Sequence, residues 1–224
     1  MALEPPNLNR TLPLRDQIYQ FIRTMIVSGQ MRPGEAINEV AIAEQLGVSR
    51  TPVREAVKRI SDEGLVNVFA QTGTFVAPIS LREMEEAYVI RSALEMESAR
   101  RAATKITPSH IETLEDNIAA HELAISRKKY AEAIRLDDVF HKTIADINDF
   151  QMLWRAVDIS KAQMDRGRYL SIPKPGYGEI TIQQHRQILK ALQRHDGAAS
   201  ATAMREHLNT SLRNALEVAA ITLE

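Results

Sequence analysis

The chain has 224 residues, of which 44% are hydrophobic and 25% are charged, and its formal net charge is −1 at pH 7. This composition is typical of a globular protein with one large domain or two modest ones. The sequence contains no cysteine, which excludes disulfides, thiolate metal sites and cysteine nucleophiles and fits a reducing compartment. Its start lacks the apolar segment of a secretion signal and no apolar run could span a bilayer, so we expect a cytoplasmic protein without a membrane partner.

Hydrophobic spacing predicts two helices near the start of the chain. Aliphatic side chains recur at helical spacing over residues 14–28 and again over residues 38–46. Gly47 follows the second of these segments, and glycine is the residue best able to adopt the left-handed conformation that ends a helix. We therefore expect a sharp turn at this position.

A third helix and a β-hairpin are predicted after that turn. Ser49 or Thr51 caps the helix, and a proline lies in its first turn, where the missing N–H costs little. The segments 65–69 and 74–77 then read as two strands on either side of a turn. Three helices followed by a hairpin predict a winged helix-turn-helix over residues 1–78.

The third helix has two faces of different chemistry. Aliphatic residues repeat at helical spacing from Val53 to Ile60, while Arg50, Arg54 and Lys58 follow one another at four-residue spacing on another face. Taken alone, these three cations are best explained as the solvated side of an amphipathic helix. The glycine turn, the Thr-Pro start and the hairpin favour DNA binding instead, because an arginine fork can span two acceptors of guanine or bind a phosphate.

The same residues carry a resemblance to a known family. The stretch "SGQMRPGEAINEVAIAEQLGVSRTPVREAVKRISDEGLV…TGTFV" resembles the DNA-binding domain of GntR-family bacterial transcription regulators over about residues 14–78. The resemblance implies that Arg50, Thr51 and Arg54 contact operator DNA and that Gly73 approaches it from the wing. Ser49 and Lys58 complete the set of residues that we expect at this interface.

Two observations limit the expected affinity for DNA. The first 78 residues carry eight basic and eight acidic residues, so any attraction must come from local clustering of cations. The family often has an arginine one residue after the glutamate that opens the second helix, and this chain has Val40 there. Its sequence preference or affinity is therefore expected to differ from that of relatives.

Residues 79–224 predict a separate, all-helical bundle of about six helices, interrupted at 171–178 and at 195–197. Within it, Asp137 and His141 are four residues apart and so lie on one helix face, which continues into the core. A buried carboxylate needs a partner, and either a metal ion or a plain Asp–His hydrogen bond would supply one.

Two further histidines lie on or beside apolar helix faces. His185 precedes "ILKAL" by one turn, and His207 follows Met204 within "AMREHL". Together with Asp137 and His141, they would form a set of nitrogen and oxygen ligands suited to a divalent ion such as zinc, nickel or manganese. The remaining histidines match no motif.

The order and spacing of these four residues resemble the ligand-binding FCD domain of the FadR subfamily of GntR regulators, over about residues 80–220. In this chain the matching motifs are Asp137 with His141, His185 with "ILKAL", and "AMREH" with His207. The resemblance implies a divalent ion held by these four side chains, with open coordination positions for a small carboxylate effector. It also implies a dimerisation domain.

Arg91 lies in the apolar stripe of a predicted helix, where an unpaired guanidinium is costly. It could form an internal ion pair with Glu95, four residues on, or it could bind a carboxylate of the effector with both arms of its fork. Similar regulators have an arginine in this context, so we expect Arg91 in the effector site.

The sequence therefore predicts a transcription repressor that binds a roughly palindromic operator as a homodimer and responds to a small organic acid at its metal site. One alternative is a metal-dependent enzyme that uses the His/Asp cluster, although no general base or nucleophile is marked beside it. Another is a constitutive DNA-binding protein whose metal is purely structural.

Overall fold

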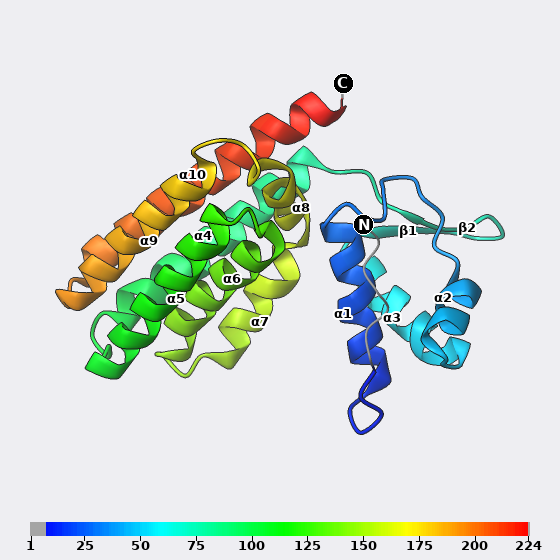
Figure 1. Cartoon of the computed structure of the whole chain (residues 1–224), viewed down its shortest axis with the longest axis horizontal. Helices are drawn as coiled ribbons and strands as arrows, with labels where there is room; N and C mark the ends of the chain where they lie inside the picture. Colours follow the sequence, from blue (N-terminus) through cyan, green and yellow to red (C-terminus); the bar gives the residue numbers. More distant parts are fainter. Residues whose placement is uncertain (1–7, 224) are drawn as a thin grey trace. The chain divides into compact units, whose positions relative to one another are not determined.

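The computed structural model describes residues 8–223, so residues 1–7 and Glu224, at the outer ends of the two predicted domains, lie outside the described residues. The chain forms two compact units that adjoin in the sequence between Ser80 and Leu81. The described residues form ten helices and one two-stranded sheet, which confirms the mostly α fold (Figure 1). None of these helices is both long enough and apolar enough to cross a membrane.

The first unit contains three helices that pack around an aliphatic core. They are α1 (Leu14–Val27), α2 (Glu39–Leu46) and α3 (Arg50–Asp62). α1 packs against α3, and the side chains of Ile18, Ile22, Val53 and Ile60 are completely buried. Burying such a side chain contributes about 1.5–3 kcal/mol, so this contact fixes α3 relative to α1.

The turn between α2 and α3 is the one predicted from Gly47, which adopts the left-handed conformation with φ +62°. Asn38 caps α2 by accepting hydrogen bonds from the amides of Val40 and Ala41, each at 3.0 Å. Ser49 occupies the N-cap position of α3, but its side chain makes no capping hydrogen bond. Its hydroxyl therefore stays exposed at the start of the helix.

The predicted hairpin consists of β1 (Val66–Phe69) and β2 (Gly73–Val76), which pair antiparallel with Val66 opposite Val76. Residues 34–37 run beside β2, where the amide of Ile37 donates to the carbonyl of Thr74 at 2.8 Å. The segment before α2 is thereby tied to the hairpin.

The second unit contains seven helices in its described residues rather than about six. They are α4 (Leu81–Ala102), α5 (Pro108–Ser126), α6 (Tyr130–Asp146), α7 (Gln151–Ser160), α8 (Ala162–Ser171), α9 (Tyr177–Gln193) and α10 (Gly197–Leu223). The additional helix arises because the chain turns at Lys161, between α7 and α8. The ammonium of Lys161 is buried there and bonds to Asp138 at 2.8 Å and Asp165 at 2.6 Å.

α10 organises this unit, because α4, α8 and α9 all pack against it (Figure 1). The approach of α8 to α10 depends on Gly167: a Cβ added there would lie 2.7 Å from the Cβ of Ala215. The hydrophobic core between α4, α5, α6, α9 and α10 includes Phe140, Ile188 and Leu208, all completely buried. Phe140 also stacks on the ring of His185, at 3.9 Å between centroids, so the core directly borders the cluster of histidines.

Candidate functional site

The predicted DNA-contacting residues form one exposed surface of the first unit. Ser49, Arg50, Thr51, Arg54 and Lys58 are all exposed, on or immediately before α3, whereas the opposite face of the helix is buried. Positive and hydroxyl-bearing side chains therefore project from the helix into solvent.

The structure brings the start of α3 and the tip of the hairpin to the same place. Arg50 and Gly73 both border one surface depression, together with Val40 at the start of α2. The side chain of Arg54 is 68% exposed, and its Nε lies 3.6 Å from a carboxylate oxygen of Glu39. Because Arg54 is largely exposed and the contact is long, little free energy is lost when the pair breaks.

In the second unit, four residues predicted as metal ligands meet at one buried point. Asp137 and His141 come from α6, His185 from α9 and His207 from α10, and one ligand atom from each lies within 4.8 Å of the others. All four side chains are buried. Nε2 of His141 lies 3.1 Å from Nε2 of His207, and Nε2 of His185 lies 3.3 Å from Oδ1 of Asp137.

Two of these imidazoles are held from behind by acceptor groups. Nδ1 of His141 lies 2.5 Å from Oε2 of Glu95, on α4, and Nδ1 of His207 lies 3.1 Å from Oε1 of Gln184, on α9. An acceptor at Nδ1 favours the proton on that atom and leaves Nε2 as a bare lone pair. With the protons on Nδ1, the Nε2 atoms of His141 and His207 face each other as lone pairs at the centre of the cluster.

Burial and charge set the ionisation of the cluster. Burial lowers the pKa of His185 and, more strongly, that of His207, so both imidazoles are neutral at physiological pH. Burial would raise the pKa of Asp137, but the nearby Arg168 guanidinium holds that pKa well below its ordinary value. A carboxylate and neutral imidazoles are the forms that bind metal ions.

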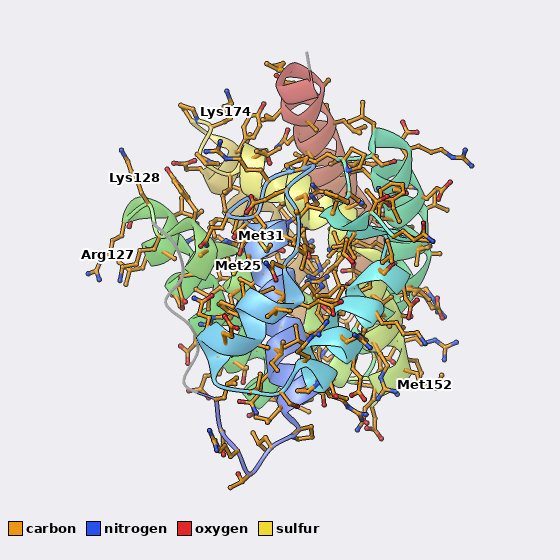
Figure 2. The ribbon with its side chains drawn as sticks, turned by 90° about the vertical axis from the view of Figure 1, so that its right-hand side faces the viewer. Met25, Met31, Arg127, Lys128, Met152 and Lys174 are labelled. Atoms are coloured by element: carbon orange, nitrogen blue, oxygen red, sulfur yellow. The ribbon has the colours of Figure 1, made fainter. Side chains whose placement is uncertain are left out.

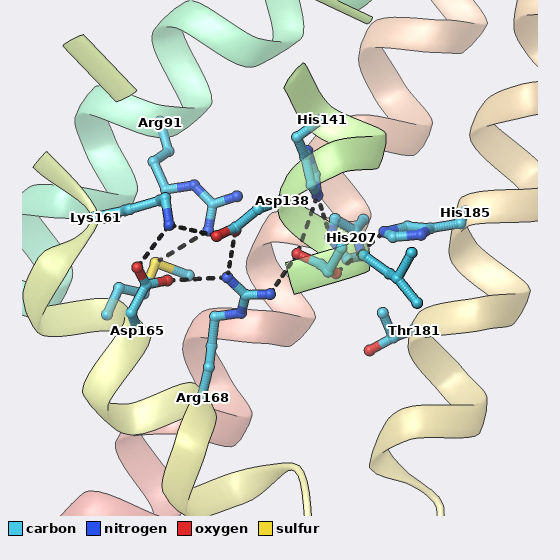
Figure 3. A network of polar contacts seen from close by, with 12 residues as sticks. Arg91, Asp138, His141, Lys161, Asp165, Arg168, Thr181, His185 and His207 are labelled. Atoms are coloured by element: carbon cyan, nitrogen blue, oxygen red, sulfur yellow. Dashed lines mark hydrogen bonds and ion pairs between the residues drawn. The ribbon is translucent and has the colours of Figure 1, made fainter. Parts of the chain in front are cut away.

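A network of buried charges adjoins this cluster (Figure 3). Arg168, on α8, donates from Nη2 to Asp137, and from Nη1 to Asp138 at 3.2 Å and to Asp165 at 2.9 Å. Lys161 bridges the same two outer aspartates. Asp137 thus links the histidine cluster to the charges of α8.

Arg91 lies inside the same unit, and its position corresponds to one of the two readings of the sequence. Its side chain is 1% exposed, and its Nε donates to Oε1 of Glu95 at 2.6 Å, which is the internal ion pair four residues apart. Glu95 in turn contacts His141. The direct contact of Arg91 with an effector stays a prediction.

A cavity of about 40 Å³ opens beside the cluster, large enough for a few water molecules. Asp137, His207 and Arg168 form one part of its wall. The loop after α8 contributes Ser171 and Ile172, and the start of α9 contributes Tyr177, Gly178 and Thr181.

Sequence reasoning missed three of the side chains that build this region: Arg168, Lys161 and His121. His121 lines the cavity, is 1% exposed, and its buried Nδ1 has no hydrogen-bond partner among the described residues. Burial lowers its pKa to about 4. The helical spacing of His121 from Leu114 and Ile118 could have predicted that it lies on the buried face of α5.

The remaining unassigned histidines have structural roles. Nδ1 of His110 accepts from the amide of Thr107 in the capping box of α5, at 3.2 Å. Nδ1 of His195 lies 2.9 Å from the carbonyl oxygen of Ala103. Neither belongs to the cavity.

Comparisons with known proteins agree with this division of the chain. Residues 14–76 match the gntR family of bacterial regulatory proteins, and residues 86–210 match the FCD domain. The HTH-type transcriptional repressor RspR of Escherichia coli K12 is 38% identical over 201 residues, which cover 90% of this chain and 88% of that protein. The Nta operon transcriptional regulator of Aminobacter aminovorans is 28% identical, over 87% of this chain and 90% of that protein.

A solved structure shares the fold. E. coli McbR/YncC superposes with a TM-score of 0.80 at 21% sequence identity, covering 95% of this chain and all of that one. The chain belongs to the GntR family of bacterial transcription regulators, with a helix-turn-helix domain followed by an FCD domain.

Proposed function

We propose that this protein is a homodimeric transcription repressor whose affinity for operator DNA is controlled by a small organic acid bound beside a divalent metal ion. Membership of the family supports the role of transcription regulator. The FCD domain contains the candidate effector site. The observation that most supports a bound metal ion is the close approach of the Nε2 atoms of His141 and His207, which lie 3.1 Å apart.

Two lone pairs that face each other in a buried site repel unless a cation lies between them. Glu95 lies against Nδ1 of His141 and Gln184 against Nδ1 of His207, and acceptors at these positions favour Nε2 as the free ligand atom of each ring. Carboxylate–histidine contacts of this kind orient the ligands of metal sites. The simplest occupant of the centre is a metal ion.

The residues fit such an ion. A zinc–nitrogen bond is about 2.0–2.1 Å long, so two nitrogen ligands of one ion lie at most about 4.2 Å apart. The four ligand atoms lie within 4.8 Å of one another, close to this limit, without an ion between them. Three nitrogens and one oxygen suit zinc, nickel or manganese, and when bound the ion would offer open positions to a carboxylate.

The first unit would bind DNA through α3 and the wing. Arg50, Thr51 and Arg54, which are exposed, would contact base edges or phosphates in the major groove, and Ser49 and Lys58 would contact the flanking DNA backbone. Gly73, at the hairpin, carries no side chain that would keep the wing away from the phosphates.

α4 is the helix of the second unit that follows the first unit in the sequence, and it also touches the cluster. It begins at Leu81, and Glu95 on the same helix lies against His141. A displacement of His141 on ligand binding would therefore act on α4. Coupling of this type is typically worth about 1–3 kcal/mol.

Repression and dimerisation rest on relatives and on symmetry. RspR is described as a repressor, and helix-turn-helix proteins bind palindromic operators as two-fold dimers. The direction of the response, with acid releasing the DNA, follows the behaviour expected of a repressor.

The test is titration of the full-length protein into fluorescent promoter DNA from beside its own gene, at low salt. It is done after chelation, after zinc loading, and after zinc loading with a panel of organic acids. We expect tight binding that at least one acid weakens by tenfold or more, only in the zinc-loaded protein. Equal affinity in every condition would identify a constitutive DNA-binding protein, and loss of all binding would refute the proposal.

A further inference from the structure

We propose that Val40, at the start of α2, is a specificity-determining residue that contacts the 5-methyl group of a thymine in the operator. This inference rests on the proposed function, because it needs DNA bound at the surface that contains α3 and the wing. It assigns a contact to a residue that the DNA-binding proposal leaves without one. It also gives one position of each operator half-site a chemical preference.

Val40 is an apolar side chain on a surface that is otherwise suited to DNA. It is 40% exposed. The large hydrophobic side chains that the described residues of the first unit leave exposed are Leu12, Val40, Val68 and Phe69. Of these, Val40 is the one that borders the depression lined by Arg50 and Gly73. Its exposure therefore coincides with the predicted interface.

The position of Val40 is fixed relative to the hairpin. Its amide donates to Oδ1 of the capping residue Asn38 at 3.0 Å, and the amide of Ile37 donates to the carbonyl of Thr74 on β2 at 2.8 Å. Valine in a helix also has one strongly preferred side-chain rotamer. The backbone and the direction of the two methyl groups are thus both defined before any DNA binds.

Val40 also adjoins the helix that we expect in the major groove. The carboxylate of its neighbour Glu39 lies 3.6 Å from Nε of Arg54, on α3. In a helix-turn-helix the first helix usually crosses the DNA backbone, while the second enters the major groove. Because the first turns of α2 and α3 adjoin in this protein, Val40 lies at the edge of the groove that α3 would enter.

The chemistry of the major groove identifies the partner of such a side chain. Base edges present hydrogen-bond donors and acceptors there, and their one distinctive apolar group is the 5-methyl group of thymine. A valine can form no hydrogen bond with the other groups, but its methyl groups can pack against that of thymine and remove both from water. Burial of one such group changes a binding constant about fourfold.

The same chemistry separates Val40 from the cations of α3. Contacts between arginine or lysine and phosphates release counterions, so their contribution to binding falls as the salt concentration rises. A contact between two methyl groups releases none. Val40 should therefore affect the choice of sequence by an amount that does not depend on salt.

The experiment uses the full-length protein and fluorescent promoter DNA from beside its own gene. Each thymine of the bound segment is replaced in turn by deoxyuridine, which lacks only the 5-methyl group, first in one half-site and then in both. The variants are Val40→Ala and Thr51→Ser, which remove only methyl groups from this surface. Leu12→Ala is the matched control, because Leu12 is an exposed aliphatic residue outside the depression. Circular dichroism and thermal unfolding accompany each titration.

We expect one thymine position at which deoxyuridine weakens binding of the wild type about fourfold per half-site, and about 15-fold in both. Val40→Ala should bind the unmodified DNA more weakly by a similar factor, and deoxyuridine at that position should then have no further effect. Both losses should be equal at low and high salt. Leu12→Ala should bind like the wild type, and Thr51→Ser should remain sensitive to deoxyuridine at this position.

Two results would contradict the inference. If Val40→Ala kept the full sensitivity to deoxyuridine, or if no deoxyuridine weakened the wild type, Val40 would have no part in base recognition. If Thr51→Ser, rather than Val40→Ala, abolished the sensitivity, the methyl contact would belong to α3. In each case the wild type still binds the unmodified promoter, so the proposed function stands, whereas a wild type that does not bind it would defeat both.

Discussion

The two units of this protein present charge in opposite ways. On α3 of the first unit, Arg54 is paired only loosely and its side chain is 68% exposed. In the second unit, Arg91 and Arg168 are buried and bonded to carboxylates at close range. Exposed cations are available to a large polyanion and lose little when their pairs break, whereas buried ones select a small ligand that replaces a defined set of partners.

This difference predicts that substitutions in the second unit alter a bound ion and the stability of the fold, while those on α3 alter only DNA affinity.

The largest effect is expected from His185→Ala. It removes one of the four predicted ligands, and the substituted protein should lose most of its bound metal, as elemental analysis of the purified protein would establish. His110→Ala is the matched control, because His110 takes part in the cap of α5 and is not one of the four clustered residues. Full metal content in His185→Ala would reject the ligand set.

Arg54→Ala should weaken operator binding by about 1–3 kcal/mol without changing the unfolding temperature, because the side chain is exposed. Arg59→Ala is the control on the same helix. Arg59 lies over the ring of Tyr19, on α1, at 3.7 Å. Fluorescence anisotropy with the promoter fragment measures the difference, and equal affinities of wild type and Arg54→Ala would remove this residue from the interface.

Glu95→Gln should lower metal affinity about 10–100-fold, since the carboxylate that orients His141 is lost. It should also lower the unfolding temperature, because Arg91 then lacks its buried counter-charge. Glu97→Gln, on the same helix, should change neither quantity, because the Glu97 side chain is 40% exposed and pairs with Arg100 and Arg101 instead. A metal titration that gives the same affinity for Glu95→Gln and the wild type would contradict this role.

The smallest effect is expected from Lys174→Glu. Figure 2 shows Lys174 extending away from the ribbon, and it belongs to the loop whose neighbours Ser171 and Tyr177 line the cavity. Reversing its charge should slow association of an anionic effector a few-fold at low salt, and the difference should vanish at high salt. Stopped-flow measurements with Lys190→Glu as control would test it, and a salt-independent difference would exclude steering.

The sequence was sufficient for the helices of the first unit, because Val53, Val57 and Ile60 recur at helical spacing and Gly47 marks the turn. It also placed Asp137, His141, His185 and His207 on inward faces, and the fold brings all four together. Helical periodicity was enough to predict that these four side chains point inward, since each adjoins a row of aliphatic residues on its helix.

The same reasoning failed for α8. Every residue from Lys161 to Arg168 is buried, so this segment has no polar face and no amphipathic pattern to reveal which side chains point toward the site. Sequence reasoning also gave no means of seeing that the chain turns at Lys161 to form two helices. Contacts such as Arg168 with Asp137 join residues 31 positions apart and depend on how α8 packs against α10.

The carboxylate of Asp137 is shared between a histidine cage on one side and a guanidinium on the other. The folded chain therefore has no unpaired Asp137 carboxylate in its interior before any ion binds, because Arg168 already pairs with it. If a divalent ion binds as proposed, the same folded chains could take it up and release it reversibly, without fresh synthesis.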